Sequence, residues 1–316
     1  MQRHSTVGVF AAVVVLVALV GAEVPYEDEL RFLREKVHET WPHMPHDKAE
    51  EFALVLFKLA QDESFINLPP ANKDGQNETA VEFPCEVYGP SDPVPTSAKR
   101  LRPADIKVLG ALGDSLTAGF GALAGTIFTL FNDFRGVSYA IGGDGPVDKV
   151  LTLGTILRKY NPDIKGLSTG KGDINSAGAH LNLAVTGAII QDIPSQVNNF
   201  IKRVKGTPGI DYDNDWKAHG GYFEELKRVA GLDKYKARED FAVVVQPFLE
   251  DTQIPTGSDG KPDTSYLAPD CFHFSEKAHQ AAAVGLWNNI IEQDKQTVWV
   301  PGEPIECPAN GDVLPT

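Results

Sequence analysis

A serine, an aspartate and a histidine stand where they could act together as a nucleophile and its base. Ser115 follows Gly113 and Asp114 directly after an apolar run, and Asp270 precedes His273 by three residues. A serine hydroxyl is a weak nucleophile until an adjacent base takes its proton. The histidine in turn needs a carboxylate that fixes its tautomer and stabilises its charged form. These residue types predict acyl-transfer chemistry with Ser115 as nucleophile, His273 as general base and Asp270 as the residue that orients the base.

Each part of this set also has a plain structural interpretation. Gly-Asp-Ser alone is common in turns, and an Asp-x-x-His segment also suits a surface histidine before a helix. Among the eight histidines, only His273 has an aspartate at this offset in a loop after a predicted strand. His279 lies on the following predicted helix, where a packing or surface role is expected. Gly187 could add its backbone N–H to that of Ser115 in an oxyanion hole, although a turn glycine is the simpler interpretation.

The elements predicted around these residues alternate between strands and helices. Apolar runs predict strands at residues 106–112, 180–185 and 241–248. Helical spacing of apolar residues predicts helices at residues 27–37, 47–60, 192–205 and 278–291. This alternation favours a parallel α/β sheet, with Ser115 just beyond the carboxyl end of the first strand, where open sheets bind ligands. Three strands are few for a domain of this length.

Composition excludes some classes of partner. The chain has 316 residues, 42% of them hydrophobic and 23% charged, and a formal net charge of −14. An acidic surface repels phosphate backbones, so nucleic acid is not an expected partner. The three cysteines lack the C-x-x-C spacing of a zinc site.

The first 22 residues have the pattern of a secretory signal peptide. A basic start precedes an apolar run over residues 7–20, and Gly21 and Ala22 supply the small residues of a cleavage site. The run is shorter than the ~20 residues of a membrane-spanning helix, so cleavage after Ala22 is preferred over a membrane anchor. We therefore expect a secreted chain, with a glycan at Asn77, which heads the only Asn-x-Ser/Thr acceptor.

Several blocks of the sequence resemble the GDSL (SGNH-hydrolase) lipase family. Residues 113–119, Gly-Asp-Ser-Leu-Thr-Ala-Gly, resemble the first block of that family, while residues 182–188 and 270–273 are similar to its second and last blocks. Further segments resemble the membrane-associated phospholipase B branch, and they lie at residues 139–144, 161–169, 238–247 and 286–289. The resemblance runs, with gaps, from about Val94 to Ile291.

This resemblance implies a fold, a reaction and a set of site residues. The fold is a flavodoxin-like three-layer α/β/α SGNH-hydrolase sheet, and the reaction is hydrolysis of acyl esters in phospholipids or lysophospholipids. Ser115, Asp270 and His273 would be catalytic, and the backbones of Ser115 and Gly187 would bind the oxyanion. No metal or other cofactor is implied, and contact with lipid would be peripheral.

The resemblance and the terminal patterns together predict a division of the chain. The predicted parts are a signal peptide (1–22), an N-terminal helical segment and linker (23–104), a GDSL/SGNH esterase domain (105–292) and a C-terminal tail (293–316) without a membrane anchor.

One block of the family pattern is absent. The family carries Gly-x-Asn-Asp after an Asp-Trp-Lys stretch, but here Asp-Trp-Lys at residues 215–217 leads to no such block anywhere in the chain. The family pattern returns near Arg238, so we expect a missing internal segment, fewer strands than the family norm and no third oxyanion donor. A partner of Cys271 would be lost with that segment. Cys85 and Cys307, which bracket the domain, are then expected to pair and to leave Cys271 free.

Two functional classes follow from this pattern. The intact Ser115, Asp270 and His273 favour a secreted esterase that hydrolyses phospholipid or lysophospholipid. The missing asparagine favours a catalytically impaired lipid-binding or interaction protein on the same scaffold. A sugar O-acetyl esterase is a weaker third interpretation, because a fold alone does not fix its substrate.

Overall fold

The computed structural model describes residues 27–61, 82–210, 244 and 246–315. Several predicted features lie outside the described residues: the signal peptide (1–22), the glycan acceptor Asn77, the Asp-Trp-Lys stretch (215–217) and half of the predicted third strand (241–248). The described residues of that strand, 244 and 246–248, form no regular strand. Among the described residues, no helix combines the length and the apolar character needed to cross a membrane.

Helices are the main regular secondary structure of the described residues, and turns and irregular segments connect them. Its α-helices are α1 (Glu27–Thr40), α2 (His46–Gln61), α4 (Ser115–Ala118), α5 (Leu153–Tyr160), α6 (Ile193–Gly206) and α9 (Glu276–Ile291). Short 3-10 helices are η1 (Ala98–Arg100), η2 (Pro103–Asp105), η3 (Ile127–Thr129), η4 (Arg135–Val137), η5 (Ala177–Ala179), η6 (Ile190–Asp192) and η7 (Thr264–Tyr266). The sequence predicted α1, α2, α6 and α9 to within three residues at each end.

Side-chain caps explain where two of these helices begin. The Thr152 hydroxyl accepts a hydrogen bond from the Thr155 amide at the start of α5. Ser275 does the same for the Ala278 amide at the start of α9. Each cap satisfies a backbone N–H that has no partner within its helix, which stabilises the helix start by about 1 kcal/mol.

The predicted parallel sheet is represented, among the described residues, by isolated bridges. The parallel bridges join Val108 to Lys165, Ala111 to Asn182 and Gly142 to Ser168. The first two predicted strands, 106–112 and 180–185, therefore lie side by side and run in the same direction. Regular strands are not formed in the described part of the chain, so the flavodoxin-like topology stays a prediction.

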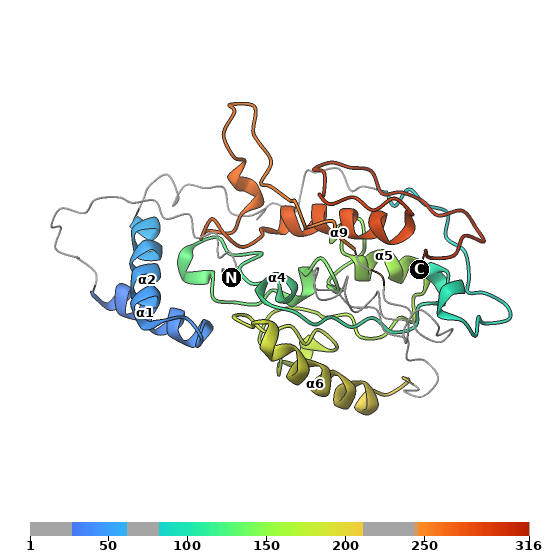
Figure 1. The fold of residues 1–316 in the computed structure, drawn as a ribbon, viewed down its shortest axis with the longest axis horizontal. Helices are drawn as coiled ribbons and strands as arrows, with labels where there is room; N and C mark the ends of the chain where they lie inside the picture. Colours follow the sequence, from blue (N-terminus) through green and yellow to red (C-terminus); the bar gives the residue numbers. More distant parts are fainter. Residues whose placement is uncertain (1–26, 62–81, 211–243, 245, 316) are drawn as a thin grey trace, which may run out of the picture.

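Helices cover these paired segments. Phe200 of α6, Ile156 of α5 and Trp287 of α9 share one apolar cluster with Leu181 and Leu183. In Figure 1, α9 and α6 lie on opposite sides of the paired segments. Burial of these side chains fixes the segment that ends at Ser115, because each large apolar side chain stabilises its position by about 1.5–3 kcal/mol.

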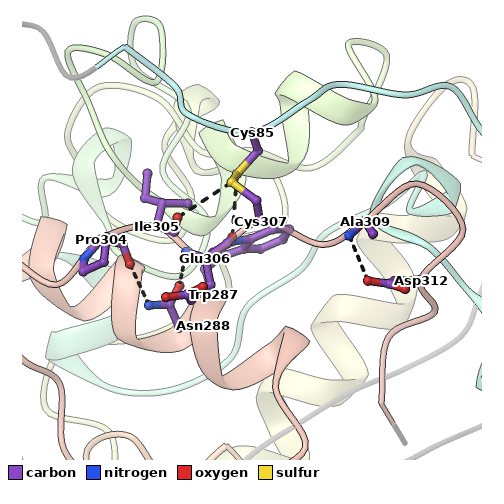
Figure 2. Close-up of a disulfide and its surroundings, with 9 residues drawn as sticks. All are labelled: Cys85, Trp287, Asn288, Pro304, Ile305, Glu306, Cys307, Ala309 and Asp312. Atoms are coloured by element: carbon purple, nitrogen blue, oxygen red, sulfur yellow. Dashed lines mark hydrogen bonds between the residues drawn. A yellow bond between two sulfur atoms is a disulfide. The ribbon is translucent and has the colours of Figure 1, made fainter.

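The segment predicted as a linker is packed in its described part. Cys85 and Tyr88 belong to the main apolar cluster, and Cys85 forms a disulfide with Cys307 across a sequence separation of 222 residues. Figure 2 shows that α9 also holds the tail: the Trp287 indole donates to the Glu306 carbonyl at 2.8 Å. The structure thus joins the pair of cysteines that was expected. Cys85 belongs to the core, and Ile305, two residues before Cys307, packs against it.

The α1–α2 hairpin forms a second apolar cluster. Leu33 and Val37 of α1 pack with Leu56 of α2, and the same cluster contains Phe120 and Leu130 from the chain that follows α4. The hairpin is therefore anchored beside the segment that carries Ser115, and its turn lies at the site described below.

Candidate active site

Two side-chain contacts hold the backbone that presents Ser115. The Gln196 side chain on α6 accepts from the Gly113 amide and donates to the Gly113 carbonyl, both at 2.8 Å. Asp114 caps α4 by accepting from the Leu116 amide at 3.0 Å. Gly113 itself has φ of +152°, a conformation that favours glycine. Ser115 therefore stands at a fixed, sharp transition from an extended segment to a helix.

Asp270 and His273 lie on a tight turn before α9. An antiparallel bridge joins Leu267 to Phe274, and the Ala268 amide donates to the His273 carbonyl at 2.8 Å. The Asp270 carboxylate accepts from the backbone amide of His273 at 3.0 Å. The carboxylate thus closes the turn as well as facing the imidazole.

The three side chains form a continuous hydrogen-bonded chain. Nε2 of His273 lies 2.9 Å from Oγ of Ser115, and Nδ1 of His273 lies 2.6 Å from Oδ2 of Asp270. These are hydrogen-bond distances for an acting nucleophile and its base. The exposed fractions of Ser115, Asp270 and His273 are 9%, 6% and 0%, so little solvent competes for these bonds.

The environment keeps Asp270 ionised. Burial alone would raise the pKa of the Asp270 carboxyl group, but the charge and hydrogen bonds of His273 and the Phe272 amide outweigh it. The pKa of Asp270 therefore lies below its usual value. An ionised carboxylate at Nδ1 leaves Nε2 free to accept the Ser115 proton and stabilises the imidazolium that results.

Aromatic rings surround the His273 imidazole. Trp41, in the turn between α1 and α2, stacks on it with ring centroids 6.2 Å apart and planes at 26°. The Phe120 ring centroid lies at 4.7 Å and that of Phe272 at 4.8 Å. Phe272 is 54% exposed. The histidine is thus held by apolar groups that also make the surroundings of Ser115 apolar.

Gly187 lies at the same end of the paired segments as Ser115. The Val185 amide donates to the Gly113 carbonyl at 3.1 Å. Ser115 lies two residues after Gly113, and Gly187 lies two residues after Val185. Gly187 has φ of +81°, and a Cβ atom built there would overlap the Thr40 carbonyl oxygen. Its glycine is therefore required by backbone conformation and by close packing against the α1–α2 turn.

A buried arginine organises the segment that leads to Gly187. Arg135 is 1% exposed, and its guanidinium donates to the carbonyls of Gly172 at 2.6 Å, Asn182 at 3.1 Å and Ala184 at 3.0 Å. It also pairs with the Asp133 carboxylate at 2.7 Å. Four acceptors on three chain segments are thereby tied to one side chain.

Two mammalian proteins named phospholipase B1 are similar to this chain in sequence. The human membrane-associated phospholipase B1 is 33% identical over 309 residues, which cover 67% of this chain and 21% of that protein. The rat protein of the same name is 30% identical over 314 residues, covering 69% of this chain and 22% of its own length. The chain is similar in sequence to phospholipase B1. It spans about a fifth of the length of these relatives.

The other comparisons found no counterpart. No protein-family model matches the chain, and no solved structure matches it.

Several residues around the site escaped the sequence analysis. Trp41, Arg135 and Gln196 act through contacts with residues that are distant in the sequence, and no local spacing reveals such contacts. A usable signal existed for Arg135 alone, because Asp133 two residues before it is an evident charge partner. The free Cys271 was expected and is exposed. Partial desolvation of the thiol and the neighbouring Asp270 charge raise its pKa to about 11, so the thiol is protonated at neutral pH.

His279 has a packing role. Its ring is 1% exposed, and Nδ1 accepts from the Tyr139 amide at 3.2 Å. Burial, together with the His273 charge, lowers the pKa of His279 to about 3. The ring is therefore neutral, which leaves His273 as the only one of these two histidines placed to serve Ser115.

Proposed function

We propose that this chain is a secreted serine hydrolase that cleaves acyl esters of phospholipids or lysophospholipids. The observation that carries the proposal is the hydrogen-bonded chain from Ser115 through His273 to Asp270. The similarity to phospholipase B1 supports the choice of substrate class. Signal-peptide cleavage after Ala22 and glycosylation of Asn77 belong to the same proposal.

The geometry supports a two-step mechanism. Nε2 of His273 takes the Ser115 proton as Oγ attacks the ester carbonyl carbon, and the carbonyl electron pair moves onto its oxygen. His273 then returns the proton to the leaving alcohol as the ester C–O bond breaks and an acyl-enzyme forms. A water molecule, deprotonated by His273, attacks the acyl-enzyme and releases the fatty acid and Ser115.

The backbone N–H groups of Ser115 and Gly187 are the proposed oxyanion donors. Ser115 begins α4, where amides lack intrahelical partners. Gly187 follows a segment fixed by Arg135 and close-packed against Thr40. Donors held in place before the reaction stabilise the developing negative charge without reorganisation.

The apolar rings around His273 favour a fatty-acyl substrate over a small polar one. Phe120, Trp41 and the half-exposed Phe272 lie within ring-contact distance of the imidazole. Phe272 is the exposed one of these rings, and a sugar O-acetyl ester would place polar hydroxyls against it, at a cost in desolvation. A long acyl chain would bury apolar surface there instead.

We propose further that this chain turns over slowly. Its sequence contains no Gly-x-Asn-Asp block, and the loss of one oxyanion donor typically lowers kcat about 10²–10³-fold. The second candidate function, a lipid-binding protein without turnover, rests on this missing block.

Hydrolysis by the purified secreted chain tests the function. Lysophosphatidylcholine, phosphatidylcholine vesicles and an acetylated sugar serve as parallel substrates, with Ser115→Ala as the matched control. We expect slow release of fatty acid from one or both lipids and none from the variant. Lipid binding without fatty-acid release by the parent chain would favour the second candidate, and faster release from the acetylated sugar would overturn the proposed substrate class.

A further inference from the structure

A cluster of metal-binding residue types lies in the α1–α2 hairpin, apart from the three residues proposed for ester chemistry. His38 on α1 and His46 and Glu50 on α2 each offer one ligand atom, and these atoms all lie within 4.8 Å of one another. Nε2 of His38 is 3.4 Å from Oε1 of Glu50. The imidazole ring centroids of His38 and His46 are 4.8 Å apart.

The hairpin itself creates this cluster. His46 and Glu50 are four residues apart on α2, so they lie on one face of the helix one turn apart. The buried leucines of α1 and α2 pack the two helices together, which brings the last turn of α1 and its His38 opposite that face. The cluster therefore follows from the packing of the hairpin and needs no special backbone geometry.

The distances fit a small tetrahedral cation. Zinc binds imidazole nitrogen at about 2.0–2.1 Å and carboxylate oxygen at about 2.0–2.2 Å, so two of its ligand atoms lie about 3.4 Å apart. The separation of 3.4 Å between His38 and Glu50 already meets this value. His46 is exposed, so its ring can turn toward the other two ligands at little cost.

We propose that His38, His46 and Glu50 bind a divalent cation of the zinc class, with water as a fourth ligand. Two imidazoles favour zinc over magnesium or calcium, which prefer oxygen ligands. Glu50 supplies the negative charge. The family resemblance implied no metal, and the cysteines lack zinc-site spacing. His38 comes near His46 and Glu50 only when α1 packs on α2.

Arg34 orients the carboxylate ligand. Its Nε lies 2.7 Å from Oε2 of Glu50, which leaves Oε1 to face His38 and the metal. Metal-binding carboxylates are commonly held in this way by a second hydrogen bond.

The proposed site clamps the turn that covers His273. His38 and His46 flank this turn, and Trp41 within it stacks on the His273 ring. The carbonyl of Thr40 packs against Gly187. A metal bound to both helices would restrict this turn, whether or not the chain hydrolyses esters.

Zinc titration of the full secreted chain tests the site. The metal-free chain is titrated with zinc or magnesium chloride by calorimetry, and circular dichroism confirms that each variant is folded. His46→Ala and Glu50→Gln each remove one ligand. His43→Ala is the matched control, since its exposed imidazole lies in the same turn but faces Asp192 at 3.7 Å.

We expect one zinc ion per chain, no comparable binding of magnesium, and affinity at least ~10-fold weaker in both ligand variants. His43→Ala should bind like the parent. Zinc should also slow hydrogen exchange at two amides of the turn, those of Trp41, which donates to the Val37 carbonyl of α1, and Met44, which donates to the Trp41 carbonyl. Absence of zinc binding, or equal affinity in parent and His46→Ala, would overturn the site. Binding without slower exchange at these amides would overturn the clamp.

Discussion

Removal of the buried Arg135 guanidinium should be among the most destabilising single changes in this chain. In Arg135→Met, the carbonyls of Gly172, Asn182 and Ala184 lose their donor and Asp133 loses its counter-charge. Breaking a buried ion pair from one side costs about 3–5 kcal/mol. Methionine keeps much of the side-chain volume, so the loss reports polar contacts rather than a cavity.

Asp133 determines how large this loss becomes. Burial raises the pKa of Asp133, and Arg135 and the Thr186 hydroxyl oppose that rise. Without Arg135 the pKa of Asp133 rises further. A carboxyl group whose pKa is higher in the folded state than in the unfolded state destabilises the fold as it ionises. Stability is lost as the pH rises from the unfolded-state pKa, about 3.9, through the folded-state pKa. The cost of Arg135→Met should therefore be smaller at pH 5 than at pH 8.

Urea unfolding followed by circular dichroism measures these changes. The double variant Asp133→Asn, Arg135→Met should recover about 1–2 kcal/mol relative to Arg135→Met, because a neutral amide replaces an uncompensated buried charge. Arg203→Met is the control, since that guanidinium is partly exposed and donates to the His180 carbonyl. Its loss should cost less than about 1 kcal/mol. A cost below about 1 kcal/mol for Arg135→Met, or no recovery in the double variant, would refute this reasoning.

Three further predictions concern the disulfide, a buried histidine and the ring over the site. Cys85→Ser with Cys307→Ser should lower the free energy of unfolding by up to about 5 kcal/mol in urea titration, because the chain-entropy model assigns that value to a loop of 222 residues; a loss below 1 kcal/mol would show that the closed loop contributes little. Burial lowers the pKa of His279 to about 3. Between pH 6.5 and pH 5, this histidine therefore takes up a proton in the unfolded chain but stays neutral in the folded chain. Parent stability should therefore fall by up to about 2 kcal/mol from pH 6.5 to pH 5 relative to His279→Gln, and parallel slopes would contradict this. Trp41→Ala should lower kcat for ester hydrolysis roughly 10-fold or more by loosening His273; an unchanged kcat would show that the ring does not position it.

The helices could be predicted from the sequence because their information is local. Apolar periodicity in α1, α2, α6 and α9 gave their ends to within three residues. The paired segments were also foreseeable, since 106–112 and 180–185 are apolar runs beside turn glycines. The packing of residues 82–104 was not, because proline-rich composition indicates a linker and cannot show that Cys85 and Tyr88 are buried.

The residues of the candidate site also fall into two groups, those that the sequence predicted and those that it did not. Ser115, Asp270 and His273 were recognisable from residue type and spacing, and the structure brings them into hydrogen-bonding contact. The residues that hold them were not, since Gln196, Arg135 and Trp41 act across long sequence separations. Such contacts form only when the helices pack together, and no local sequence pattern predicts this packing.

Fluorophosphonate labelling is the measurement that tests the central claim most directly. The probe reacts with a serine whose hydroxyl is activated by an adjacent base. We predict one adduct on Ser115 in the folded chain, none on that peptide in Ser115→Ala, and a rate lowered about 10²–10⁴-fold in His273→Gln. Failure of the folded parent chain to label at Ser115, or an equal rate in His273→Gln, would contradict the proposed mechanism.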